Sequence, residues 1–232
     1  MSAGSASARP LIVAHRGVWG EFPQNSLPAL QAAIDAGCEM AELDVRRTKD
    51  GRLVAVHDAR VRGTLVSALD HAELTRRLAP GQAPLLAEMV QLAHGRIRLD
   101  VELKEAGYAR DVLESLTGLD PAQYVLTSFL DEALAEVRAC AAQARAGLLV
   151  GPGRGRRLEA RLAACGASFI GAHAGLARAG LLAWAANRGL ESYVWTVNER
   201  RALRSLLSDP RVAGVITDRP ALALRIRSEL QR

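Results

Sequence analysis

The chain has 232 residues, of which 49% are hydrophobic and 24% charged, a balance typical of a folded globular protein and not of a disordered or fibrous one. Its formal charge of +5 comes from arginines scattered along the chain, and only 4% of the residues are aromatic. A nucleic-acid-binding surface usually clusters basic and aromatic residues. We therefore expect no nucleic-acid partner.

Residues 1–10 are rich in serine and alanine and lack the basic and apolar regions of a secretion signal. We predict a disordered tail over residues 1–10, followed by one folded domain over residues 11–232. The cysteines Cys38, Cys140 and Cys165 are odd in number and widely spaced, which predicts small buried residues in a reducing compartment. The chain is expected to be cytoplasmic, with no transmembrane segment. Its oligomeric state does not follow from the sequence.

Short aliphatic runs alternate with Ala/Leu/Arg-rich stretches that have apolar residues at helical spacing, which predicts βα units and a parallel sheet. Eight such runs predict a TIM (β/α)8 barrel. A doubly wound open sheet is the alternative, but no glycine-rich phosphate loop follows the first run. Residues 151–155 resemble such a loop, but Pro152 lacks the backbone N–H that phosphate binding would need. The predicted strands are residues 11–14, 40–45, 97–103, 124–128, 146–150, 169–172, 192–197 and 212–217.

The intervening segments have the length and periodicity of surface helices. Pro220 favours a helix start, and Gly37, Gly166 and Gly189 favour helix ends. Roughly fifty residues separate the second and third barrel strands and contain an extra strand pattern at 53–56, so we predict a short insertion over residues 46–84. The predicted helices are residues 25–36, 131–142, 156–165, 176–187, 199–208 and 220–230.

Carboxylates occur within two of the predicted barrel strands. Glu42 and Asp44 are two residues apart, so both side chains point to the same face of their strand. Asp100, Glu102 and Lys104 share one face of the next barrel strand. Buried carboxylates need either a salt-bridge partner or a metal ion, and each explanation fits any one of these residues. For the whole cluster, at the ends of barrel strands, we expect one hard divalent cation, Mg²⁺ or Ca²⁺.

Two histidines follow strand patterns close to these carboxylates. His15 ends the first predicted strand, and His57 follows the extra strand pattern at 53–56. The Asp50-Gly51 turn returns the chain toward the second strand and is expected to bring His57 near the carboxylates. Two histidines there form a plausible acid and base pair near neutral pH. Of the other histidines, His173 ends the sixth predicted strand and has a weaker claim.

Several motifs, in order along nearly the whole chain, resemble those of the glycerophosphodiester phosphodiesterases, within a wider group of barrel phosphodiesterases that includes lysophospholipase D and sphingomyelinase D. The motifs in the first half are highly specific, and the later ones are weak individually. The matching segments are Ala14-His15-Arg16-Gly17, Pro23-Gln24-Asn25-Ser26, Glu42-Leu43-Asp44-Val45, Val56-His57-Asp58, Val101-Glu102-Leu103-Lys104, Thr127-Ser128-Phe129, Trp195-Thr196-Val197-Asn198 and Thr217-Asp218-Arg219-Pro220.

The resemblance implies a metal-dependent enzyme that hydrolyses a small-molecule glycerophosphodiester to glycerol 3-phosphate and an alcohol. Its implied site consists of a catalytic pair, His15 and His57, the metal ligands Glu42, Asp44 and Glu102, and the phosphoryl contacts Arg16 and Lys104. Trp195 ends the seventh predicted strand. If it faces the pocket, it offers a substrate-binding wall for a choline-like headgroup; packing in the core explains it equally well.

Two departures from the family pattern leave other functions open. Gln24 stands where the family usually has a glutamate, and the segment after Asp58 does not follow the usual sequence. One alternative is a lysophospholipase D or sphingomyelinase D-like lipid headgroup hydrolase, which an exposed apolar lip around Trp19, Phe22 and residues 61–69 would favour. Another is a catalytically weak barrel that binds phosphodiesters, and retention of both histidines and the three carboxylates argues against it.

Overall fold

Eight parallel strands close into a barrel in the structure, a computed structural model that describes residues 9–232. The ring closes because β1 pairs with both β2 and β11. This confirms the predicted (β/α)8 fold, while residues 1–8 of the predicted tail lie outside the described residues. The barrel strands are β1 (Leu11–His15), β2 (Met40–Arg47), β6 (Arg98–Leu103), β7 (Tyr124–Ser128), β8 (Ala146–Val150), β9 (Phe169–His173), β10 (Glu191–Trp195) and β11 (Val212–Thr217).

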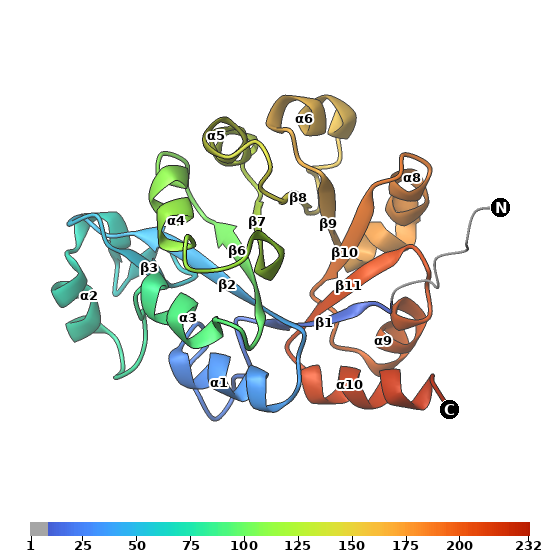
Figure 1. Cartoon of the computed structure of the whole chain (residues 1–232), viewed down its shortest axis with the longest axis horizontal. Helices are drawn as coiled ribbons and strands as arrows, with labels where there is room; N and C mark the ends of the chain where they lie inside the picture. The colour runs from blue at the N-terminus through green and yellow to red at the C-terminus, as the bar shows by residue number, and fades with distance from the viewer. Residues whose placement is uncertain (1–8) are drawn as a thin grey trace.

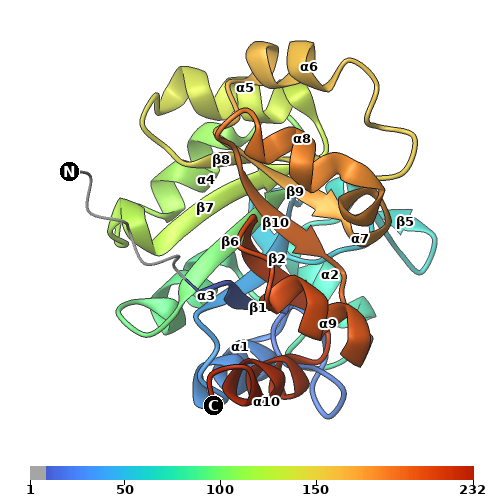
Figure 2. The ribbon, with the colours of Figure 1, turned by 90° about the vertical axis from the view of Figure 1, so that its right-hand side faces the viewer.

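Helices surround the strands, as Figures 1 and 2 show from two directions. None of the helices in residues 9–232 is long and apolar enough to cross a membrane. The α-helices are α1 (Leu27–Asp35), α2 (His71–Arg77), α3 (Leu86–Ala93), α4 (Ala109–Ser115), α5 (Asp131–Cys140), α6 (Leu158–Cys165), α7 (Ala174–Leu176), α8 (Leu182–Ala186), α9 (Arg200–Leu207) and α10 (Pro220–Glu229).

A small group of elements lies between β2 and α3 and projects from one side of the barrel (Figure 1). Its strand β3 (Leu53–Ala55) pairs antiparallel with β2. The other elements are β4 (Arg60–Val61), β5 (Thr64–Leu65), the short helix η1 (Val66–Ala68) and α2. Buried residues of these elements and of the loops beside them form a small core of their own, which packs against β3: Val54, Val61, Val66, Leu69, Leu74 and Ala83.

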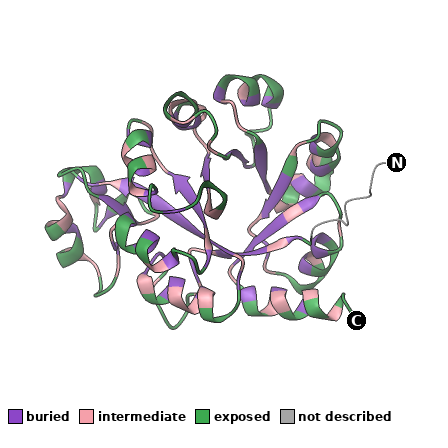
Figure 3. Ribbon diagram, viewed as in Figure 1, coloured by how far each residue is buried: buried purple, intermediate pink, exposed green. Residues whose placement is uncertain are grey.

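The strands are buried on both faces (Figure 3), so the main core has two parts. One lies between the strands and the helices, and the other fills the barrel. Inside the barrel, Phe169 and Tyr193 pack with ring centroids 5.3 Å apart. Glycines make room for them: a Cβ on Gly147 would lie 2.2 Å from the Phe169 ring. These side chains fill the interior toward the amino ends of the strands, so a pocket has room only toward the carboxyl ends.

Local backbone conformation moves some predicted boundaries. The first helix begins at Leu27 and not at residue 25, because Asn25 has φ 54° and Ser26 is the N-cap. The predicted helix over 176–187 is interrupted by η3 (Ala177–Leu181), where Gly180 has φ 110°. Short 3-10 turns also occur, including η2 (Pro121–Gln123) before β7. The expectation that all three cysteines are buried is wrong for Cys140, which is exposed because it lies at the end of α5.

Candidate active site

The strand register brings the predicted carboxylates together. Glu42 on β2 lies beside Asp100 on β6, and Asp44 lies beside Glu102. All four side chains are buried. Oxygens of Glu42, Asp44 and Glu102 lie within 4.8 Å of one another, close enough to contact one ion. The cluster therefore follows from the pairing of two adjacent strands.

Two side-chain cations contact this cluster. Lys104 Nζ lies 2.6 Å from Glu102 Oε1 and 3.1 Å from Asp44 Oδ1. Arg16 Nε lies 3.1 Å from Asp44 Oδ2, and the Arg16 backbone N–H donates to Glu42 Oε2 at 3.0 Å. When all groups are ionised, four carboxylates, Asp100 included, and two cations leave two negative charges, which one divalent cation would balance.

Glu42 and Asp44 differ in how far these cations compensate their charge. Burial, followed by the negative charges of Asp44 and Glu102, raises the pKa of Glu42 well above its usual range. Burial alone would also raise the pKa of Asp44, but Lys104 and Arg16 outweigh it and lower that pKa. Among the described residues, Glu42 Oε1 and Asp44 Oδ1 are both buried without a hydrogen-bond partner, although Lys104 Nζ lies 3.1 Å from the Asp44 oxygen. An all-oxygen cluster with an unpartnered buried oxygen fits a hard cation.

Burial also dominates at the two carboxyls of β6. It raises the pKa of Glu102 to about 7, although Lys104 opposes the shift. The pKa of Asp100 likewise rises to about 7, since burial outweighs the hydrogen bond that Thr127 Oγ1 donates to Asp100 Oδ1 at 2.6 Å. Asp100 therefore extends the cluster. The sequence placed it on the correct face, but its contact with Thr127 depends on the pairing of β6 with β7.

The loop after β1 positions Arg16. Arg16 has φ 60°, and Gly17 has φ 82° with its Cα so close to α1 that a Cβ would lie 2.7 Å from the Ala29 carbonyl. Gln24 Oε1 accepts from Arg16 Nη1 at 2.7 Å, so the amide supplies a neutral partner where the family usually has a glutamate. Asn25 Nδ2 donates to Asp44 Oδ2 at 2.8 Å. The Gln24-Asn25 segment thus supports both Arg16 and Asp44.

The two predicted histidines line the same pocket. His15 Nε2 lies 3.9 Å from Glu42 Oε2 on one side of the ring, and His15 Nδ1 lies 2.6 Å from Asp218 Oδ1 on the other. His57 Nδ1 lies 2.8 Å from Asp58 Oδ1, and Arg46 Nε donates to the His57 carbonyl at 2.9 Å. Burial lowers the pKa of His57, although the hydrogen bond with Asp58 opposes the shift.

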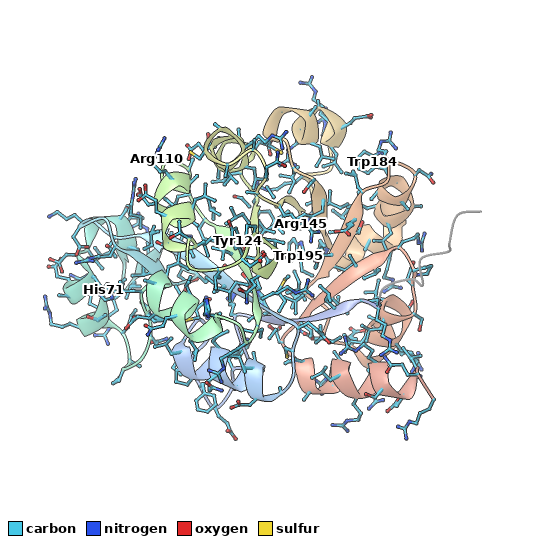
Figure 4. The ribbon with its side chains drawn as sticks, viewed as in Figure 1. His71, Arg110, Tyr124, Arg145, Trp184 and Trp195 are labelled. Carbon is cyan, nitrogen blue, oxygen red and sulfur yellow. The ribbon has the colours of Figure 1, made fainter. Side chains whose placement is uncertain are left out.

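The pocket has a volume of about 200 Å³ and combines the charged floor with an apolar wall. Trp195 and Phe129 form the wall, with their rings edge to face and centroids 5.3 Å apart. Trp195 lies among the strands near the centre of Figure 4, whereas the labelled His71 lies at the periphery. His173 packs against Trp195 and caps α7, and it is not among the residues that line the pocket. The residues lining it are His15, Arg16, Glu42, His57, Asp100, Glu102, Lys104, Thr127, Phe129, Leu149, Trp195, Thr196 and Ile216.

A larger groove, of about 510 Å³, lies elsewhere on the surface between α6 and α8 and includes Trp184 and Arg157. None of the predicted site residues lines it. Size alone therefore does not identify the site in the described part of the chain. The smaller pocket at the carboxyl ends of the barrel strands is the candidate active site because it contains the buried carboxylates, both histidines and two cations.

Sequence and structural comparisons relate the chain to known phosphodiesterases. The chain is 35% identical over 113 residues to a glycerophosphodiester phosphodiesterase of Bacillus altitudinis, a match that covers 42% of this chain and 46% of that protein. It is 23% identical to one from Caldanaerobacter subterraneus, over 94% of this chain and 98% of that protein. An Oleispira antarctica phosphodiesterase, solved with its product sn-glycerol-3-phosphate, has the same fold (TM-score 0.82, 22% identity, coverage 97% and 98%).

The family profile covers most of the chain. The profile of the Glycerophosphoryl diester phosphodiesterase family matches residues 15–222, a range that includes His15, the acidic cluster, Trp195 and Asp218. The resemblance stated from the sequence motifs is thereby confirmed. The chain belongs to the glycerophosphoryl diester phosphodiesterase family of enzymes.

Proposed function

We propose that this protein hydrolyses glycerophosphodiesters to sn-glycerol 3-phosphate and an alcohol in the pocket between β1, β2 and β6. The single observation that carries the proposal is the convergence of Glu42, Asp44 and Glu102 with two histidines in one small pocket. Membership of the family supports the reaction, and the Oleispira antarctica enzyme holds sn-glycerol-3-phosphate as its product. Nothing in the pocket requires a larger substrate than a small phosphodiester.

Glu42, Asp44 and Glu102 would hold one Mg²⁺ or Ca²⁺. A bound divalent cation would stabilise negative charge on the phosphoryl oxygens and lower the pKa of a bound hydroxyl group. The Lys104 ammonium has three donors, of which one is hydrogen-bonded to Glu102 Oε1, while Asp44 Oδ1 lies 3.1 Å from Nζ; the Arg16 guanidinium has five donors. Each cation therefore keeps a donor for a phosphoryl oxygen while it remains paired with the carboxylates.

His15 and His57 would handle the two proton transfers. In hydrolysis the attacking oxygen forms a bond to phosphorus and loses a proton, while the bond to the leaving alkoxide breaks and that oxygen gains a proton. Two imidazoles lining one pocket provide one acceptor and one donor for these transfers. Trp195 and Phe129 would form the wall against which the leaving alcohol packs.

A lipid substrate is the second candidate, because the loop between β1 and α1 exposes two large apolar side chains. Trp19 is 41% exposed and Phe22 is 40% exposed, and Trp19 Nε1 donates to the His15 carbonyl. This lip lies next in sequence to the site and would contact an acyl chain.

Location in the cytoplasm stays a prediction, and it is supported by three cysteines that form no disulfide bond.

One assay separates these possibilities. Purified protein is incubated with glycerophosphocholine, glycerophosphoglycerol, lysophosphatidylcholine and sphingomyelin, with Mg²⁺, with Ca²⁺ or with excess chelator, and the released alcohol and phosphomonoester are measured. We expect sn-glycerol 3-phosphate from the first two substrates, only when metal is present. Cleavage confined to the lipids would establish the second candidate. Binding without turnover would indicate a catalytically weak barrel, and full turnover in chelator would contradict the proposed metal site.

A further inference from the structure

Closure of the barrel places a carboxylate directly behind His15. In the register of β1 with β11, Ala14 lies opposite Thr217, so the next residues, His15 and Asp218, are lateral neighbours. They are 203 positions apart in the sequence, yet His15 Nδ1 lies 2.6 Å from Asp218 Oδ1. The opposite ring nitrogen, Nε2, faces Glu42 at 3.9 Å. Asp218 therefore holds the side of the imidazole that points away from the carboxylate cluster.

Asn198, from the loop after β10, fixes the Asp218 carboxylate in turn. Asn198 Nδ2 donates to Asp218 Oδ2 at 2.6 Å. Its Oδ1 accepts from the Asp218 backbone N–H at 2.9 Å and from Thr217 Oγ1 at 3.2 Å. Because Oδ1 faces two donors, the amide cannot rotate without losing both contacts, and Nδ2 must face Asp218.

We propose that Asp218 and Asn198 are positioning residues that act through His15, holding its proton on Nδ1 and directing Nε2 toward the reacting phosphodiester. The inference rests on the proposed function. A carboxylate is only an acceptor, so its partner nitrogen must carry the hydrogen. Neutral His15 then has its lone pair on Nε2, the nitrogen on the side of the pocket. Burial would raise the pKa of Asp218, but its bonds with His15 and Asn198 outweigh that and lower it, which keeps the group ionised.

His57 has a partner of a different kind. Its Nδ1 lies 2.8 Å from Asp58 Oδ1, but the Asp58 side chain is 72% exposed, against 25% for Asp218. Asp58 also follows His57 directly in the chain, and no second residue is hydrogen-bonded to its carboxylate in the described structure. Water screens such an exposed pair, so Asp58 constrains its histidine weakly. Asp58→Asn is thus the matched control for Asp218→Asn.

Asp218→Asn tests the positioning role. If the new amide keeps its oxygen toward Asn198 Nδ2, it presents NH₂ to His15 Nδ1, which must then accept and carry its proton on Nε2. We expect kcat for glycerophosphocholine to fall on the order of 10²–10⁴-fold, with KM changed less than about threefold, since Asp218 is not among the residues that line the pocket. Asp58→Asn should cost about fivefold or less. Asn198→Ala should cost about tenfold, because it removes the hydrogen bond that Nδ2 donates to the Asp218 carboxylate and the two that Oδ1 accepts.

A double variant distinguishes positioning from a merely structural role. In the His15→Ala background, Asp218→Asn should change the rate by less than about twofold, because there is no imidazole left to hold. An equal loss in both backgrounds, or wild-type turnover in Asp218→Asn, would overturn the inference. The ¹⁵N NMR spectrum of the His15 ring gives a readout without turnover: Nδ1–H in the wild type and Nε2–H in Asp218→Asn. Nε2–H in the wild type would overturn the inference, and an inactive wild type with Nδ1–H would instead contradict the proposed function.

Discussion

Glu42 and Asp44 project from the same face of β2, yet their surroundings shift their pKa values in opposite directions. Asp44 contacts Lys104 and Arg16, which lower its pKa, whereas burial and neighbouring carboxylates raise the pKa of Glu42. The two carboxylates therefore contribute differently to the site. The charge of Asp44 is compensated by Lys104 and Arg16, whereas an ionised Glu42 lacks such compensation, and a bound metal ion would provide it.

Glu42→Gln should abolish metal binding and at the same time stabilise the metal-free protein. The amide keeps the shape of the side chain and removes a buried charge that burial opposes. We expect turnover to fall by at least about 10²-fold. In chelator at pH 8, the free energy of unfolding should rise, because a carboxyl whose pKa is raised in the folded protein destabilises the fold at a pH above its ordinary pKa. Calorimetric titration with Mg²⁺ or Ca²⁺ and urea unfolding measure the two effects. Glu39→Gln is the matched control and should keep metal binding, because Glu39 precedes β2, pairs with Arg227 and is not part of the acidic cluster. A Glu42→Gln variant that binds metal normally would contradict the assignment.

Asp100→Asn should alter how stability depends on pH. The pKa of Asp100 is about 7 in the folded protein against an ordinary value of 3.8, so its stabilising contribution is fully present below the ordinary value and is lost as the pH rises through 7. In chelator, Asp100→Asn should match the wild type near pH 4 and exceed its free energy of unfolding by up to about 4 kcal/mol at pH 8. Urea unfolding at both pH values checks this, with exposed Asp35→Asn as control. An equal difference at the two pH values would argue against a protonated Asp100.

Gly17→Ala should destabilise the protein and displace Arg16. A Cβ at Gly17 would lie 2.7 Å from the Ala29 backbone, and φ there is 82°. The backbone penalty and the clash together predict a loss of about 2–4 kcal/mol in the free energy of unfolding. Gly20 also has positive φ but open space around its Cα, so Gly20→Ala carries the backbone penalty without the clash. Thermal unfolding of the two variants tests the difference, and equal losses would show that the contact with α1 is not tight.

Trp195→Leu distinguishes a substrate-binding wall from simple packing. Trp195 Nε1 donates to the Gly171 carbonyl at 2.8 Å, while the ring lines the pocket. An aromatic face stabilises a quaternary ammonium by about 0.5–2 kcal/mol, so kcat/KM for glycerophosphocholine should fall about 2- to 30-fold more than for glycerophosphoglycerol. Parallel assays of the two substrates measure the ratio. An identical loss for both would favour the packing role.

The spacing of residues within single strands predicted much of this site. The two-residue periodicity of a strand placed Glu42 with Asp44 and Asp100 with Glu102, and the barrel placed both strands side by side. The turn at Asp50-Gly51 correctly predicted that His57 returns to β2, because β3 pairs antiparallel with it. Local rules sufficed for these residues, since each depends on one strand or one hairpin.

Contacts made by closing the barrel could not be predicted from such local rules. The pairing of His15 with Asp218 requires β1 to meet β11 in one particular register, and no short-range pattern in the sequence fixes that register. The direction of the Arg16 side chain depends on its φ of 60°, which favours glycine and is held here by α1 and Gln24. The sequence around Thr127 and Phe129 indicates no role for them, because their contacts with Asp100 and Trp195 depend on pairings between strands.

A crystal structure with Mg²⁺ or Ca²⁺ and sn-glycerol 3-phosphate tests the central claim most directly. We predict one ion bonded to Glu42, Asp44 and Glu102, with the phosphoryl group between Arg16, Lys104 and the two histidines. Carboxylate oxygens would lie about 2.0–2.6 Å from the ion, depending on which metal binds. Phosphate bound in the groove near Trp184, or an ion that avoids Glu42, would contradict the account.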